Sequence, residues 1–168
     1  MTSLVTGVSR RAIPQNQTLQ PEENVNRSLT YSSLSWYHGI MPSRIFAIPA
    51  FDKFARKARI GDERLISAVD RADRGLIYAD LGEVVIKQAV GRPNEASING
   101  FRTIIGFRTE FRAFFLYGFP KNEADNITSN ALKDFRRRSA LLMAISDEAI
   151  AALVAAEELR EIERQKES

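Results

Sequence analysis

The feature that most constrains the fold is a period-two pattern of apolar residues in the middle third of the chain. It occurs in three segments, Val84–Val90, Phe101–Phe107 and Arg112–Phe119. Alternate side chains of a strand point to opposite faces of a sheet, so each segment is predicted to be a β-strand that buries one face or both. The connection between the last two segments is short enough for a hairpin. The three strands are therefore predicted to form an antiparallel meander.

Helical patterns lie on both sides of this meander. After a short apolar run at 44–48, which we predict as a first strand, Pro49 suits the first position of a helix with an aromatic face. A second amphipathic helix follows and ends at Gly75, and two more are predicted at about 130–144 and 146–164. The order is β-α-α-β-β-β-α-α. This predicts an α+β fold, with a small antiparallel sheet packed against two N-terminal helices and followed by C-terminal helices.

The chain is predicted to hold one folded domain behind an N-terminal extension. Residues 1–40 are rich in Asn, Gln, Ser and Thr and show no sustained period, which is typical of a disordered arm or an atypical extension. The domain is placed at 41–168, because 168 residues with 44 % hydrophobic content suit a single core. No apolar run approaches 18 residues and the N-terminus does not resemble a signal peptide, so we expect a cytoplasmic protein with no membrane contact.

Composition excludes several kinds of chemistry. The chain has no cysteine and one histidine, His38, in the extension, so a thiolate nucleophile and a four-ligand zinc site are out of reach. Asp70 and Asp73 are interpreted as solubilising charge on a helix. Net charge is +3, but residues 41–122 carry fourteen basic and nine acidic groups, a net +5. This central positive charge points to phosphate binding or phosphate chemistry, and the alternative is a surface that merely favours arginine.

Two cations are predicted to project from the strands. Lys87 lies in the middle of VVIKQAV, and Arg102 follows a glycine-containing loop at the start of FRTIIGF. A guanidinium held on a rigid strand offers a planar fork that matches a phosphate. The alternatives are that Lys87 is an ordinary solvated residue and that Arg102 pairs with an acid such as Asp80 or Glu83.

Four further residues are candidates for contacts with a nucleic acid. Arg92, Lys121 and Asn122 lie in a loop or at a strand end, where functional groups often collect. Tyr117 shares one alternation with phenylalanines, so it is either a core residue or a side chain that stacks on a base. The candidate RNA-binding residues are accordingly Arg92, Tyr117 and Asn122.

Segments along most of the chain resemble a known family. They are FDKFARKARIGDERLISAVDRADRGLIYADLG, VVIKQAVGRP, GFRTIIGFR and RAFFLYGFPKNEADNI, which run in order between Met41 and about Leu159. Together they resemble the RelE/ParE superfamily of type II toxin–antitoxin toxins, in particular the RelE-like, HigB-type branch. The resemblance implies a compact β-sheet toxin with two N-terminal helices. It also implies cleavage of messenger RNA on the translating ribosome and inhibition by a cognate antitoxin.

The resemblance also implies roles for single residues. Lys87 matches a basic residue on the strand before GFR, and Arg102 matches the arginine that contacts the scissile phosphate in related toxins. Lys121 and Asn122 occupy the strand end where relatives place Lys and Arg, so Asn122 is a departure from the family pattern. The antitoxin is expected to be a helix-turn-helix protein, and DNA would be contacted only through it.

The reaction expected from this resemblance is RNA cleavage without a metal or cofactor, by attack of a ribose 2′-OH on the adjacent phosphate. Such a reaction needs a proton acceptor, stabilisation of the anionic phosphorane and a donor for the leaving oxygen. The expected catalytic residues are Lys87 as general base or electrostatic helper, Arg102 for the phosphorane and Lys121 on the leaving side. Two alternatives remain open: a ParE-like poison of DNA gyrase, and a degenerate toxin that only binds an antitoxin.

Overall fold

The computed structural model describes residues 42–91, 100–123 and 127–165. These residues belong to one compact unit, Met41–Gln165. The predicted N-terminal extension, residues 1–40, lies outside the described residues, as does the candidate Arg92.

A single mixed sheet organises the described part of the chain. Its strands are β1 (Arg44–Ala47), β2 (Ala79–Gly82), β3 (Val85–Val90), β4 (Phe101–Arg108), β5 (Arg112–Pro120) and β6 (Arg160–Ile162). They lie in the order β2-β3-β4-β5-β1-β6. Strands β2 to β5 form an antiparallel meander, β1 runs parallel to β5, and β6 runs antiparallel to β1. The predicted α+β class and the meander are confirmed, whereas β2 and β6 were not predicted.

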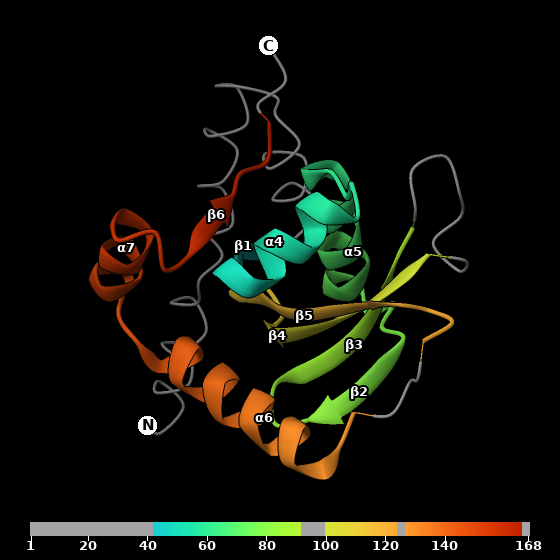
Figure 1. Cartoon of the computed structure of the whole chain (residues 1–168). Helices are drawn as coiled ribbons and strands as arrows, with labels where there is room; N and C mark the ends of the chain where they lie inside the picture. Colours follow the sequence, from blue (N-terminus) through green and yellow to red (C-terminus); the bar gives the residue numbers. More distant parts are fainter. Residues whose placement is uncertain (1–41, 92–99, 124–126, 166–168) are drawn as a thin grey trace, which may run out of the picture. The chain divides into compact units, whose positions relative to one another are not determined.

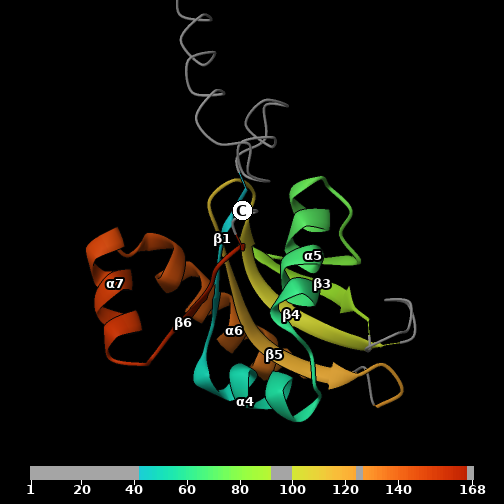
Figure 2. The same cartoon turned by 90° about the horizontal axis from the view of Figure 1, so that it is seen from above.

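Helices cover both faces of this sheet. Helices α4 (Pro49–Lys57) and α5 (Asp62–Asp73) lie on one face, and α6 (Ser129–Ala144) lies across the other (Figure 1). Helix α7 (Asp147–Ala155) follows α6, beyond the edge formed by β1 and β6 (Figure 2). We call the two faces the α4/α5 face and the α6 face.

The helix ends follow from local sequence. Pro49 occupies the first turn of α4, where its missing N–H is not needed. Thr128 Oγ1 accepts from the Ala131 N–H at 3.1 Å and so caps α6. Ser146 Oγ caps α7 in the same way, accepting from the Ala149 N–H at 3.1 Å. These caps satisfy amide groups that a helix start otherwise leaves without a partner.

Each face of the sheet has its own core. The α4/α5 face buries a large cluster that includes Phe51, Leu65, Ile105 and Phe115. The α6 face buries two smaller clusters, one around Phe46, Phe114, Leu116, Met143, Ile150 and Leu159 and the other around Val85, Ile104 and Phe119. Helix α6 packs directly on the backbone of β4, since a Cβ added to Gly106 would lie 2.5 Å from Ser139 Oγ.

The β2–β3 connection is a two-residue turn. Gly82 and Val85 are paired, and the residues between them, Glu83 and Val84, have φ angles of 49° and 58°. Two successive positive φ values are what a type I′ hairpin requires, and this turn matches the right-handed twist of the strands. A β-branched residue such as Val84 rarely adopts this conformation, so the turn is strained.

The prediction of one C-terminal helix over about 146–164 was wrong. Helix α7 ends at Ala155, Glu157 has φ 60°, and the chain returns as β6. Residues 147–164 contain strong helix formers and no Gly or Pro, so local propensity favours a helix. Pairing with β1 overrides that propensity, because it buries Leu159 (3 % exposed) and Ile162 (2 %).

Two arginines fasten this C-terminal segment to the helices. Arg160 donates to Asp52 Oδ1 at 2.7 Å and, through both terminal nitrogens, to Asp62 at 3.0 Å. Arg164 pairs with Asp70 Oδ1 at 2.5 Å, and both side chains are only 13 % exposed. The hydrogen bond to Asp62, as the largest cause, and the hydrogen bond to Asp52 raise the pKa of Arg160.

The interpretation of Asp70 and Asp73 as solubilising charge was therefore wrong. Asp70 binds Arg164, and Asp73 accepts from the Ser43 N–H (3.0 Å), Ser43 Oγ (2.8 Å) and the Glu110 N–H (3.1 Å). The period of α5 showed that these side chains share a helix surface. It could not show that the chain before β1 and the chain after β6 both pass over that surface.

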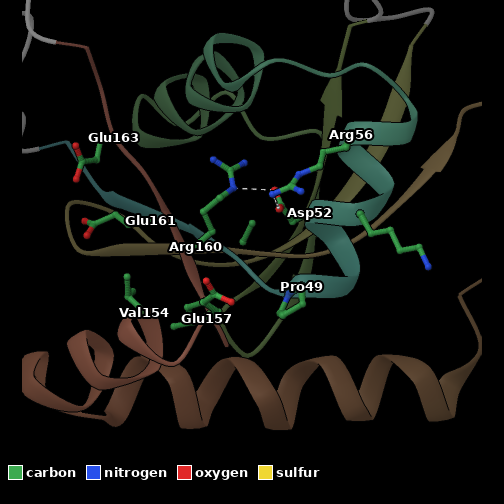
Figure 3. A pocket seen from close by; sticks show the side chains of 11 residues that line it. Pro49, Asp52, Arg56, Val154, Glu157, Arg160, Glu161 and Glu163 are labelled. Carbon is green, nitrogen blue, oxygen red and sulfur yellow. Dashed lines mark hydrogen bonds and ion pairs between the residues drawn. The ribbon is translucent and has the colours of Figure 1, made fainter.

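A groove lies between α4 and the C-terminal segment, where Arg160 reaches toward Asp52 (Figure 3). Its volume is about 740 Å³. Its lining carries both signs of charge and comprises Ala47, Pro49, Asp52, Lys53, Arg56, Val154, Glu157, Leu159, Arg160, Glu161 and Glu163. The groove is at the β1–β6 edge of the sheet, so it is separate from the candidate residues on β3 and β4.

Candidate nucleic-acid site

Lys87 and Arg102 lie on the same face of the sheet. In the β3–β4 register, Ala89 is opposite Arg102 and Lys87 is opposite Ile104. Ile104 packs in the α6-face core, whereas Ile105 packs in the α4/α5-face core. Side chains two residues apart on a strand share a face, so Lys87 and Arg102 both belong to the α6 face and are diagonal neighbours. Alternation within each strand was sufficient to predict which side chains of that strand share a face. It could not give the register between β3 and β4, which makes Lys87 and Arg102 neighbours.

Arg102 is the most unusual of the candidate side chains. It is only 4 % exposed, and Nη1 donates one long hydrogen bond, 3.4 Å, to the Phe101 carbonyl. No carboxylate among the described residues pairs with it, so the alternative pairing with Asp80 or Glu83 does not occur there. Asp80 Oδ1 instead accepts from the Gly82 N–H at 2.8 Å. A buried guanidinium without a neutralising carboxylate is costly, and an anionic ligand would offset that cost.

The ring of Tyr78 covers this guanidinium. The Arg102 Cζ lies 4.5 Å from the ring centroid, a cation–π contact. Tyr78 is itself 54 % exposed, so much of its side chain is open to solvent. Arg102 and Tyr78 together place a cation directly beneath an exposed aromatic surface.

A buried glutamine holds the backbone of Tyr78 in place. Gln88 is 1 % exposed, and its Oε1 accepts from the Tyr78 N–H at 3.0 Å. Its Nε2 donates at 3.0 Å to the carbonyls of Ala68 and Leu76. The segment between α5 and β2 is thus tied to both α5 and β3, which fixes the position of the Tyr78 backbone.

Tyr117 is exposed and not a core residue. The β4–β5 register shifts between Ile104, opposite Tyr117, and Ile105, opposite Phe115. Leu116 is the extra residue of this bulge, so Phe115 and Tyr117 do not share a face as simple alternation would require. Phe115 is buried on the α4/α5 face. Tyr117 is 48 % exposed on the α6 face, and its ring lies 5.8 Å from the rings of both Phe119 and Phe135.

Lys121 and Asn122 follow the end of β5 and are exposed. The Lys121 N–H donates to the Gly100 carbonyl at 3.1 Å, so this position adjoins the start of β4, two residues before Arg102. The described residues of the candidate site are therefore Tyr78, Lys87, Arg102, Tyr117 and Lys121.

Sequence analysis missed two residues near this group. Tyr78 precedes β2, a four-residue strand whose sequence ADLG has no periodic signal. Arg71, on α5, donates from Nη2 to the Ala89 carbonyl at 2.6 Å, and Ala89 is the cross-strand neighbour of Arg102. Burial lowers the pKa of Arg71, but the group is still a cation at neutral pH. Only the tertiary arrangement brings either residue to β3 and β4.

Among residues 42–91, 100–123 and 127–165, no group of three His, Cys, Asp or Glu side chains is arranged to hold a metal ion. Over the same residues, no helix has both the length and the apolar character needed to span a bilayer.

The model of a family described as RelE toxin of RelE / RelB toxin-antitoxin system matches residues 43–162. This match takes in every strand and helix described above, and the chain therefore belongs to the RelE toxin family. It is a toxin of a toxin–antitoxin system, with an antitoxin as partner. No curated protein matches the chain.

Proposed function

We propose that this toxin is a ribosome-associated endoribonuclease that cleaves messenger RNA and so inhibits translation. The observation that carries the proposal is Arg102, a buried guanidinium that no described carboxylate neutralises, on the same face as Lys87. An RNA phosphate supplies the missing negative charge, and the fork of Arg102 suits its geometry. The family match supports a toxin, and the choice of RNA cleavage rests on these cations.

The proposed reaction is attack of a ribose 2′-oxygen on the adjacent phosphorus. A bond forms between O2′ and phosphorus, and the bond from phosphorus to O5′ breaks, leaving a 2′,3′-cyclic phosphate and a 5′-hydroxyl. Lys87 acts as general base or electrostatic helper for the 2′-OH, Arg102 stabilises the phosphorane, and Lys121 neutralises and protonates the leaving O5′. Tyr117 stacks on a base, while Arg92 and Asn122 bind the RNA backbone.

The partners follow from the same proposal. The substrate is messenger RNA held on the ribosome, and the antitoxin is a helix-turn-helix protein that also carries the pair to DNA. We assign the toxin to the HigB-type branch of the family on the segments VVIKQAVGRP, GFRTIIGFR and RAFFLYGFPKN.

The test is cleavage of a defined message on translating ribosomes, with the new 5′ ends mapped. Arg102→Gln removes the charge and the fork while keeping a polar side chain, and we expect the cleavage rate to fall about 10²–10³-fold. Lys57→Gln is the matched control, because it removes one exposed cation from α4, on the opposite face of the sheet. Thermal unfolding of both variants excludes a loss due to misfolding.

The outcomes separate the alternatives. New 5′ ends with the wild type that disappear with Arg102→Gln support the proposal. Equal cleavage by the wild type and by Arg102→Gln removes Arg102 from the mechanism. Intact messages together with DNA breaks would instead indicate a gyrase poison, and normal growth without antitoxin would indicate a degenerate toxin.

A further inference from the structure

Tyr78 is an exposed aromatic side chain at the proposed RNA site that no family motif assigns. Most large apolar or aromatic side chains of the β3–β5 meander are buried, whereas Tyr78 and Tyr117 are 54 % and 48 % exposed. An exposed tyrosine ring is a stacking surface for an unpaired base, and such stacking tolerates any base because every base has a π face.

Arg102 ties this ring to a phosphate position. Its guanidinium carbon lies 4.5 Å from the centroid of the Tyr78 ring. Consequently, a phosphate that accepts hydrogen bonds from the guanidinium brings the base of an adjoining nucleotide beside the ring. Arg102 is 4 % exposed, so a phosphate reaches its N–H groups only after a covering group moves. Tyr78 covers the guanidinium and is itself open to solvent, which makes its ring the described group best placed to move.

The backbone of Tyr78 is held by Gln88 while its ring is not. The Tyr78 N–H donates to Gln88 Oε1 at 3.0 Å, and no described residue accepts a hydrogen bond from the Tyr78 hydroxyl. Rotation about the side-chain torsions can therefore turn the ring without breaking the Gln88 contacts. This is the behaviour needed of a side chain that exchanges one planar partner for another.

We propose that Tyr78 is a base-stacking residue of the RNA site. When RNA binds, its ring leaves the guanidinium of Arg102 and stacks on the base of the nucleotide next to the phosphate that Arg102 binds. The ligand class is single-stranded RNA with at least two unpaired nucleotides. This inference rests on the proposed function, because it takes the phosphate on Arg102 as its starting point.

The test uses a short RNA with a 2′-O-methyl group at the cleavage position, which blocks attack, and 2-aminopurine on either side of it. The fluorescence of 2-aminopurine falls when the base stacks on an aromatic ring. We expect quenching with the wild type and with Tyr78→Phe, which keeps the ring. We expect no quenching at that nucleotide with Tyr78→Leu, which fills similar space without a π face. Stacking of one base corresponds to an affinity change of about 5- to 150-fold, so Tyr78→Leu should bind more weakly by that factor.

Ribosomal cleavage is measured alongside quenching, so that failure of the stacking inference can be distinguished from failure of the nuclease proposal. Quenching by Tyr78→Leu equal to that of the wild type would overturn the stacking role, even where the wild type cleaves messages normally. Quenching by the wild type and Tyr78→Phe alone supports that role. Were the wild type to quench and yet leave ribosomal messages intact, the nuclease proposal would fail and the stacking inference would stand.

Discussion

Replacing Gln88 by leucine tests whether the hydrogen bonds of this buried side chain stabilise the fold and hold the backbone of Tyr78 in place. Gln88 is 1 % exposed and contacts three backbone groups at 3.0 Å each. Leucine is similar in size but makes none of these hydrogen bonds. Ala68 lies within α5, so its carbonyl keeps a helical partner. The Tyr78 N–H and the Leu76 carbonyl lose their side-chain partner.

The magnitude follows from these two groups. A buried polar group left without a hydrogen bond costs about 1–3 kcal/mol, and both groups are partly buried rather than fully enclosed. We therefore expect Gln88→Leu to lower the free energy of unfolding by about 2–4 kcal/mol. For a domain of this size that corresponds to a fall in Tm of roughly 10 °C.

The assay is urea unfolding together with hydrogen exchange of single amides. Gln165→Leu is the control, because it makes the same change at an exposed position. The Tyr78 amide should exchange faster in Gln88→Leu, while amides of α7 keep their protection. A Gln88→Leu protein within about 0.5 kcal/mol of the wild type, with unchanged exchange at Tyr78, would refute the reasoning, since surface substitutions alone vary by that much.

Two more predictions concern the edges of the sheet. Val84→Gly should raise the free energy of unfolding by about 0.5–1 kcal/mol, because Val84 holds φ at 58° in the β2–β3 turn and glycine adopts that angle without strain; a less stable variant in urea unfolding would contradict this. Arg160→Gln should lower stability by about 1–2 kcal/mol, because it removes the ion pairs to Asp52 and Asp62 from a side chain that is 34 % exposed. Amides of β6 should then exchange faster in Arg160→Gln than in the wild type, while amides of β4 keep their protection. Equal protection of β6 in the two proteins would contradict a stabilising role for these ion pairs.

The spacing of apolar residues was sufficient to predict most of the strands and helices. Strands β1, β3, β4 and β5 and helices α4, α5 and α6 all lie where apolar spacing predicted them. The strand at 160–162 could not be predicted, because its residues favour a helix and become a strand only through pairing with β1. Strand β2 is too short and too polar to show a period.

Some features of the candidate site could also be predicted from the sequence, and others depend on the tertiary structure. Alternation along β4 is sufficient to put Arg102 on the face opposite Phe101 and Ile105, and both of these are buried on the α4/α5 face. The exposure of Tyr117 depends on a bulge at Leu116, which adds one residue to β5 opposite β4 and leaves no mark in the sequence. Tyr78 reaches Arg102 only because Gln88, on another strand, fixes the segment before β2. The assigned roles of Lys87, Arg102 and Lys121 stay predictions until cleavage is measured.

The pairing of β1 with both β5 and β6 has a consequence for folding. Ile45 lies opposite Ala113 on one side and Ile162 on the other, so the first strand of the unit is inserted between segments that are distant along the chain. Contacts of such long sequence separation form late and slow the search for the native state. The core cluster on the α4/α5 face contains Ile45, Ala113 and Ile162, so neither half of Met41–Gln165 contains a complete hydrophobic core. We therefore expect loss of either terminal strand to abolish cooperative folding of the entire unit, instead of leaving a smaller stable fragment.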